Sequence, residues 1–214
     1  MRTCLVGSLL WSALIVQAQV RAVAPPSASA GLNHFSPGVD AGDYVYVSGQ
    51  GSRRPDGSLP ATFAAQAWQA LDNVKLVVEA AGLTMEHVVY TQVYLEDIGK
   101  YREMNGVFAK VFAKTPPARA VLGVAKLPEP SIQISAVAVR NLANMRAVYP
   151  PGFKSEEPAS PGILTGDRLF ISGMPGSDSS SGKVPDDPAA QVDFALERMK
   201  AVVEAAGLDL RHMV

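Results

Sequence analysis

Two similar stretches decide the architecture: LDNVKLVVEAAGLTMEHVV at residues 71–89 and LERMKAVVEAAGLDLRHMV at residues 196–214. They begin at Leu71 and Leu196, an offset of 125 residues, and upstream the correspondence continues with an offset of 124. Self-similarity at a fixed spacing indicates repeated structural units. We therefore expect one complete copy over residues 33–143 and a second over residues 150–214, which matches only the N-terminal half of the first.

Hydrophobic periodicity predicts the elements of the first copy. Apolar residues in steps of three and four indicate amphipathic helices, and Gly82 is placed to end the first of them. The expected helices cover residues 63–81 and 100–114, and the expected strands cover residues 44–48, 88–95, 119–124 and 132–139. This order predicts an α+β domain in which two helices pack on one face of a mixed sheet.

The second copy lacks a counterpart of residues 90–139. Its expected helix begins near Pro188, and the apolar stripe of that helix would have little sheet to cover it. Exposed apolar surface of this kind favours association. The stripe consists of Leu196, Met199, Val203 and Ala206.

Charge and composition exclude several classes of function. The sequence has 19 Lys plus Arg against 20 Asp plus Glu, a net charge of −1, whereas a nucleic-acid-binding surface is normally basic. It has no nucleotide-binding or nucleophile-elbow motif. The three histidines are His34, His87 and His212, and the last two are repeat equivalents that follow a helix, so we predict no metal site. From the charge balance we predict no nucleic-acid partner.

The N-terminal residues are typical of a secretory signal peptide. Arg2 precedes an apolar run from Cys4 to Val16, and small residues around Ala18 and Ala24 offer cleavage sites. The run is too short for an ordinary membrane span, although an uncleaved anchor is the alternative. We expect a signal peptide over residues 1–24, a linker over residues 25–32, and an exported protein, periplasmic or secreted, without a membrane anchor.

Several motifs together resemble the RidA (YjgF-type) family of imine deaminases. They cover the first copy in order: Ser48-Gly49-Gln50, Gln69 to Val74, Glu79 to Leu83, Asn105, Pro117-Ala118-Arg119-Ala120 and Ile132 to Ala136. The resemblance implies a chorismate-mutase-like α+β fold, a homotrimer with ligand sites between subunits, and hydrolysis of 2-imino or enamine acids to 2-oxo acids and ammonia. It implies neither a cofactor nor a metal. A tandem chain could instead place its own two copies in equivalent positions.

Arg119 is the main candidate for catalysis and substrate binding. A guanidinium can bind the planar carboxylate of a 2-imino acid through two parallel hydrogen bonds. Asn105, the second candidate, could donate to a ligand oxygen or position Arg119, and the Ser48 hydroxyl could lie near the ligand. The alternatives are an exposed Arg after a Pro-Pro turn, a helix-surface Asn and a turn-forming Ser.

Two positions depart from the family pattern. Phe35 stands where active members carry a Tyr, and Ser135 stands where they carry a Glu thought to orient the attacking water. Serine without a partner is not a general base at neutral pH. Two hypotheses follow: a hydrolytic deaminase, whose activity these departures could weaken, or a non-catalytic module that binds a small carboxylate-bearing metabolite such as a 2-oxo acid.

Overall fold

The computed structural model describes residues 20–26, 34–153, 158–178 and 180–214. Six strands form the main sheet, in the order β1-β2-β3-β6-β4-β5, and three form a small sheet, in the order β7-β8-β9. The strands are β1 (Arg21–Val23), β2 (Gly38–Asp40), β3 (Tyr44–Gln50), β4 (Val88–Leu95), β5 (Ala118–Gly123), β6 (Ile132–Val139), β7 (Arg146–Val148), β8 (Gly162–Leu164) and β9 (Leu169–Ile171). The helices are α1 (Phe63–Ala80), α2 (Tyr101–Val111) and α3 (Pro188–Ala205).

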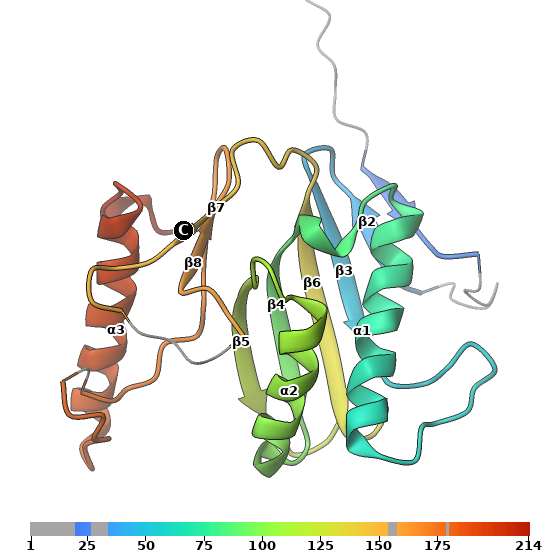
Figure 1. The fold of residues 1–214 in the computed structure, drawn as a ribbon, viewed down its shortest axis with the longest axis horizontal. Helices are drawn as coiled ribbons and strands as arrows, with labels where there is room; N and C mark the ends of the chain where they lie inside the picture. The colour runs from blue at the N-terminus through green and yellow to red at the C-terminus, as the bar shows by residue number, and fades with distance from the viewer. Residues whose placement is uncertain (1–19, 27–33, 154–157, 179) are drawn as a thin grey trace, which may run out of the picture.

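The main sheet is mixed, because β4 and β5 are parallel while its other pairs are antiparallel. Helices α1 and α2 lie side by side on one of its faces (Figure 1). Side chains alternate along β6, so that Ile132, Ile134, Ala136 and Ala138 enter the core beneath the helices. The α+β fold with two helices on one face is thus confirmed.

Helix α1 follows its sequence pattern closely. Thr62 caps its first turn by accepting a hydrogen bond from the Ala65 amide. Ala67, Leu71 and Val74 are buried on its inner face, and Gly82 leaves the helix with φ of +77°, a conformation that favours glycine. Helix α2 was expected over residues 100–114 but ends at Val111, because the chain turns before Pro116 and Pro117.

Strand β1 lies inside the segment expected to be a signal peptide. Arg21–Val23 pairs antiparallel with β2, and Val23 is buried against the core. Residues 1–19 and 27–33 lie outside the described residues, so most of the leader and linker falls there. The main sheet therefore includes residues that cleavage near Ala24 would remove and that cleavage after Ala18 would retain.

The small sheet and α3, here called the C-terminal unit, have the same element order as β1–β3 and α1. A Cβ atom at Gly38 would lie 2.6 Å from Val77 Cγ1, and one at Gly162 would lie 2.7 Å from Val202 Cγ1. Each glycine therefore lets its strand approach its helix closely. Gly162 and Val202 lie 124 and 125 residues after Gly38 and Val77, the offsets of the sequence repeat.

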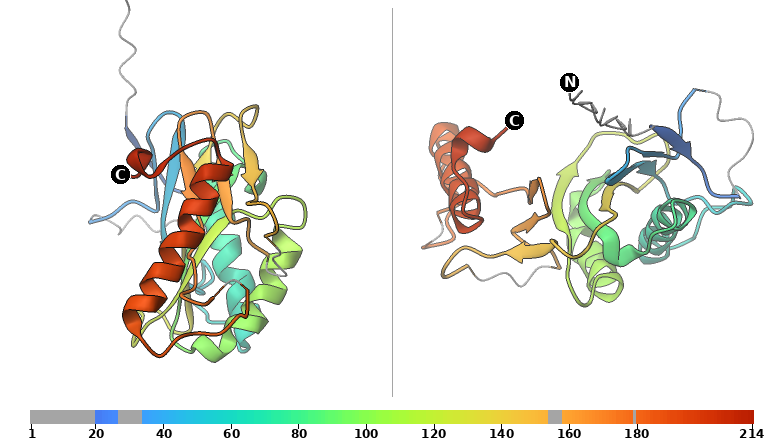
Figure 2. Two further views of the ribbon diagram at one scale, coloured as in Figure 1. Left: turned by 90° about the vertical axis from the view of Figure 1, so that its left-hand side faces the viewer. Right: turned by 90° about the horizontal axis from the view of Figure 1, so that it is seen from above.

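One face of the C-terminal unit packs on the face of the main sheet opposite α1 and α2, beside β4 and β5 (Figures 1 and 2). Ile163 and Phe170 from the small sheet meet Tyr44, Val89 and Ala118 there. Helix α3 lies on the outer side of the small sheet (Figure 2).

The apolar stripe of α3 is only partly covered. Leu196 is 53% exposed and Val203 is 2% exposed, whereas Leu71, the repeat equivalent of Leu196 in α1, is 2% exposed. The α1 stripe is covered by β3 and β6, and the described C-terminal unit has no counterpart of β6. The expected exposure is therefore found along part of the stripe.

Among the described helices, none is long and apolar enough to cross a membrane.

Candidate functional site

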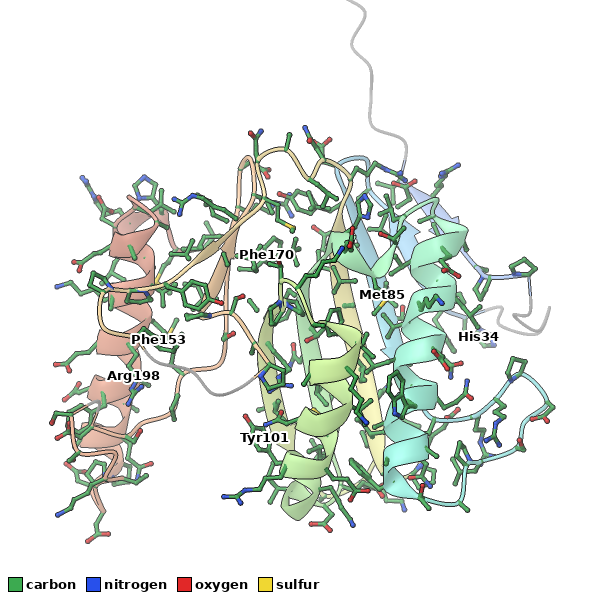
Figure 3. All side chains as sticks on the ribbon, viewed as in Figure 1. His34, Met85, Tyr101, Phe153, Phe170 and Arg198 are labelled. Atoms are coloured by element: carbon green, nitrogen blue, oxygen red, sulfur yellow. The ribbon has the colours of Figure 1, made fainter. Side chains whose placement is uncertain are left out.

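A cleft of about 700 Å³ lies where the edge strand β5 and helix α2 meet the C-terminal unit. Such volumes are ordinary for small-molecule sites. Both parts of the chain contribute to its lining, and Figure 3 labels three of the side chains, Tyr101, Phe153 and Arg198. The lining consists of Tyr101, Arg119, Ala120, Val121, Leu122, Phe153, Ala159, Ser160, Pro161, Ser172, Gly173, Met174, Pro175 and Arg198.

Arg119 is the most constrained side chain of this cleft. Only 4% of the residue is exposed, and Arg119 Nη2 donates to Asn105 Oδ1 at 2.7 Å. Its guanidinium carbon lies 4.8 Å from the centroid of the Phe108 ring, and Nη1 lies 3.6 Å from Met104 Sδ. Cation–π contact and an oriented hydrogen bond hold the guanidinium in one position. Asn105 is thus in position to orient Arg119, one of the two roles considered for it.

The C-terminal unit fixes the backbone of the same residue. The Arg119 amide donates to Ser172 Oγ at 2.8 Å, and the Gly173 amide donates to the Arg119 carbonyl at 3.0 Å. Ser172 Oγ in turn donates to the Ser160 carbonyl at 2.6 Å. The two walls of the cleft are therefore joined by hydrogen bonds at the arginine itself.

Ser48 and Phe35 are not at this cleft. Ser48 Oγ donates to the Ser36 carbonyl at 2.6 Å, the arrangement that Ser172 makes with Ser160, but on β3 of the main sheet. Phe35 is 60% exposed. The residues found beside Arg119 are the repeat equivalents 124 positions later, Ser172 and Ala159. The repeat offset was the signal that could have identified them.

Ser135 also lies away from the cleft. It is half-buried on β6, in register with Gln92 of β4. Thr91 and Ala136 are cross-strand neighbours, and Thr91 pairs in turn with Arg119. Arg119 therefore shares the helix-covered face with Ala136, and Ser135 points to the opposite face. Within one chain, Ser135 does not meet a ligand bound at Arg119.

The described lining offers one kind of chemistry clearly, the binding of anions. It supplies two arginines and the Tyr101 hydroxyl, and no carboxylate stands among the described lining residues. The Ser172 and Ser160 hydroxyls already donate to the carbonyls of Ser160 and Pro116. Sequence reasoning missed Arg198, because Asn73, its repeat equivalent, has no charge. Within the described ranges, no group of three or more His, Cys, Asp or Glu side chains lies close enough to hold a metal ion.

Comparison with known proteins identifies the family of the first part of the chain. The family model described as Endoribonuclease L-PSP matches residues 25–140. The 2-iminobutanoate/2-iminopropanoate deaminase of Escherichia coli strain K12 is 40% identical over 125 residues, covering 56% of this chain and 98% of that protein. A RutC family protein of Haemophilus influenzae is 37% identical over 119 residues, covering 53% and 92%.

Solved structures give the same result. The crystal structure of the YjgF gene product from E. coli matches with a TM-score of 0.54 and 40% identity, over 56% of this chain and 99% of that one. RidA from an Antarctic Psychrobacter matches with a TM-score of 0.53 and 33% identity, over 56% and 98%. With the first part of the chain covered by sequence and by structure, this protein belongs to the Endoribonuclease L-PSP family, the family of RidA and YjgF.

Proposed function

We propose that this protein is a hydrolytic deaminase of reactive 2-imino or enamine acids, releasing 2-oxo acids and ammonia at the Arg119 cleft. The observation that carries the proposal is the buried Arg119 guanidinium, oriented by Asn105 and Phe108 at a cleft large enough for a small carboxylic acid. The similarity to a 2-iminobutanoate/2-iminopropanoate deaminase supports it.

The proposed reaction starts with the substrate carboxylate bound to Arg119 through charge-assisted hydrogen bonds. This fixes the adjacent C=N carbon in the cleft, a contribution of proximity and orientation. Water adds to that carbon, its oxygen forming the new C–O bond while a proton passes to the nitrogen. The carbinolamine then collapses: its hydroxyl proton passes to the nitrogen, the C=O double bond forms and the C–N bond breaks, which releases a 2-oxo acid and ammonia. These reaction steps need no metal or cofactor.

A second candidate function is binding without turnover. The described lining lacks a carboxylate to activate water, and a missing general base typically lowers rates by 10²–10⁴-fold. Ala159, which stands at the repeat equivalent of Phe35, has no hydroxyl either. These observations favour a module that binds 2-oxo acids or similar metabolites and hydrolyses imines slowly.

Replacing Arg119 tests both candidates. We expect Arg119→Ala to weaken binding of 2-oxobutanoate at least about tenfold, since a charge-assisted hydrogen bond contributes about 1.5–3 kcal/mol. Arg119→Lys, which keeps the charge without the planar fork, should lie between. Binding is measured by calorimetric titration, and hydrolysis by trapping imines made in situ with semicarbazide. Arg102→Ala, an exposed position on α2, is the matched control.

The outcomes separate the two functions. Fast hydrolysis by the unaltered protein that Arg119→Ala abolishes supports the deaminase. Tight 2-oxobutanoate binding with slow hydrolysis supports the binding module. Unchanged binding in Arg119→Ala, with Arg102→Ala also unchanged, would remove the carboxylate clamp on which both rest.

We also propose a homo-oligomer, the family expectation being a trimer. On the main sheet, Ser48 donates to the Ser36 carbonyl as Ser172 donates to the Ser160 carbonyl at the cleft. Ser172 also accepts from the Arg119 amide of the edge strand β5. The edge strand β5 of another chain would fit against Ser48 in the same way. Sedimentation velocity tests this directly, and a monomer at every concentration would contradict it.

Export remains a proposal from the N-terminal sequence. The place of Arg21–Val23 in the main sheet favours cleavage after Ala18, which retains β1. N-terminal sequencing of protein from the native host would then begin at Gln19, whereas an intact Met1 in a cytosolic pool would contradict export.

A further inference from the structure

The cleft contains a second guanidinium, that of Arg198 on α3. Arg198 is half-buried on the wall opposite β5 and α2, where Figure 3 labels it beside Phe153. Its Nε and Nη2 donate to the Ser177 carbonyl at 3.2 and 3.0 Å, and Nη2 also reaches Ser177 Oγ at 3.2 Å. One edge of the guanidinium therefore fastens the loop that precedes α3.

The repeat shows that this fastening does not need a charge. Asn73 on α1 is the equivalent of Arg198, and its Nδ2 donates to the carbonyls of Gly51 and Arg53 at 2.9 and 2.8 Å. Ser177 lies 124 residues after Arg53, so both side chains bind the same point of their loops. A neutral amide performs this task in the first copy. At the cleft the same position carries a cation.

The surroundings make that cation relevant to a ligand. Among the described residues that line the cleft, Arg119 and Arg198 are the charged ones, one on each wall. Val121, Leu122 and Met174 supply apolar surface, and in such surroundings electrostatic attraction is stronger than in bulk water. The volume of about 700 Å³ also exceeds what a four-carbon acid requires.

We propose that the cleft prefers 2-oxo and 2-imino acids with a second carboxylate at the far end of the side chain. Arg119 binds the carboxylate next to the reacting carbon, and Arg198 binds the distal one. This assignment rests on the proposed function, in which Arg119 binds the carboxylate next to the reacting carbon. It adds a specificity-determining residue from α3 and a substrate class, the dicarboxylates.

A length series of ligands tests the proposal by calorimetry. Oxaloacetate, 2-oxoglutarate and 2-oxoadipate place a second carboxylate at increasing distance, and 2-oxobutanoate has none. We expect one dicarboxylate to bind at least about tenfold more tightly than 2-oxobutanoate, the effect of one charge-assisted contact. The length that binds best reports the spacing of the two guanidinium groups.

Arg198→Asn substitutes the residue found at the equivalent position of the first copy and should keep the loop contact. We expect the preference for the best dicarboxylate over 2-oxobutanoate to fall about tenfold or more. Arg198→Lys should keep part of the preference, which separates lost charge from a disturbed loop. Lys200→Gln removes a charge from the exposed side of α3, where Lys200 pairs with Glu204, and should leave the preference unchanged.

The results distinguish this proposal from the proposed function. Equal affinities for 2-oxobutanoate and every dicarboxylate, or a preference that survives Arg198→Asn, would overturn the role of Arg198. In either case the Arg119→Ala result with 2-oxobutanoate would still decide the carboxylate clamp. A preference that falls equally in Arg198→Asn and Lys200→Gln would indicate general electrostatics and would also overturn the assignment.

Discussion

Thr91 of β4 is the direct cross-strand neighbour of Arg119 and is fully buried. Among the described residues, its hydroxyl has no hydrogen-bond partner. An unsatisfied buried hydroxyl destabilises a fold, and replacing it with a methyl group of the same shape removes that cost. We expect Thr91→Val to raise the free energy of unfolding by about 1 kcal/mol in urea titration.

The control for this substitution is Thr115→Val, at an exposed position after α2, where we expect little change. A loss of stability in Thr91→Val would contradict the prediction. It would indicate that the hydroxyl is satisfied by a water molecule at the base of the Arg119 site.

The residues assigned to the site from sequence differ in how far their positions could be predicted. Arg119 and Asn105 come together because β5 follows α2 after a short turn, so their proximity is a local matter and was predictable. Within one chain Ser48 and Ser135 lie away from the Arg119 cleft, because their positions depend on which sheet face they point to and on how the second copy docks. No local pattern encodes either.

At the scale of elements, Asp40 connects three strands of the main sheet. Its Oδ2 accepts from Arg21 Nε of β1 at 2.9 Å and from Arg140 Nη2, just beyond β6, at 2.6 Å. Burial opposes ionisation of this carboxyl, but hydrogen bonds from Arg21, Gly42 and Arg140 outweigh it and lower its pKa. Only 8% of the Asp40 side chain is exposed.

The lowered pKa predicts a dependence of stability on acid. The folded state binds this proton less readily than the unfolded state, so the contribution is present above the unfolded pKa of about 4 and is lost as the pH falls through the lower folded value. We expect Asp40→Asn to lower the unfolding free energy at pH 7 by about 1–3 kcal/mol. The variant should also lose part of the acid sensitivity seen between pH 5 and 3.

Urea titrations of both proteins at pH 7, 5 and 3 provide the measurement. Asp72→Asn, on the exposed side of α1, should match the unaltered protein at each pH. An acid sensitivity that remains complete in Asp40→Asn would place its origin in other carboxyl groups.

The long elements were predictable and the short ones were not. Helix α1 and strands β4 and β6 have apolar patterns long enough to identify each as a helix or a strand. Their ends were predicted to within one or two residues. Strands β1 and β2 have three residues each, too few for an alternation to show. They exist because β3 offers a free edge and Asp40 binds Arg21, interactions that depend on the folded sheet.

At the scale of the molecule, a set of contacts around Tyr44 joins the C-terminal unit to the main sheet. The Tyr44 hydroxyl lies 2.6 Å from Thr165 Oγ1 and donates to Asp167, and Arg168 stacks over the Tyr44 ring at 4.3 Å. Burial, and after it the hydrogen bond to Asp167, raises the pKa of the Tyr44 hydroxyl. The hydroxyl therefore remains a donor throughout the neutral range.

We expect Tyr44→Phe to loosen this docking, since the loss of hydrogen bonds at a buried position costs about 1–2 kcal/mol. Amide exchange in β8 and β9 should become roughly tenfold faster, because 1.4 kcal/mol changes an opening equilibrium tenfold. Exchange in β4 and β6 should change little. Tyr94→Phe removes a hydroxyl that bonds Gln92 within the main sheet, and equal acceleration of β8 and β9 in that control would contradict the assignment.

The two walls of the cleft belong to one polypeptide, and only residues 140–145 separate β6 from β7. A short tether of this kind gives its two ends an effective concentration in the millimolar range. Dilution separates walls that different molecules contribute, but it does not change the distance between walls that share a chain. Both walls of the Arg119 cleft therefore come from a single molecule, and the distance between them does not change with protein concentration.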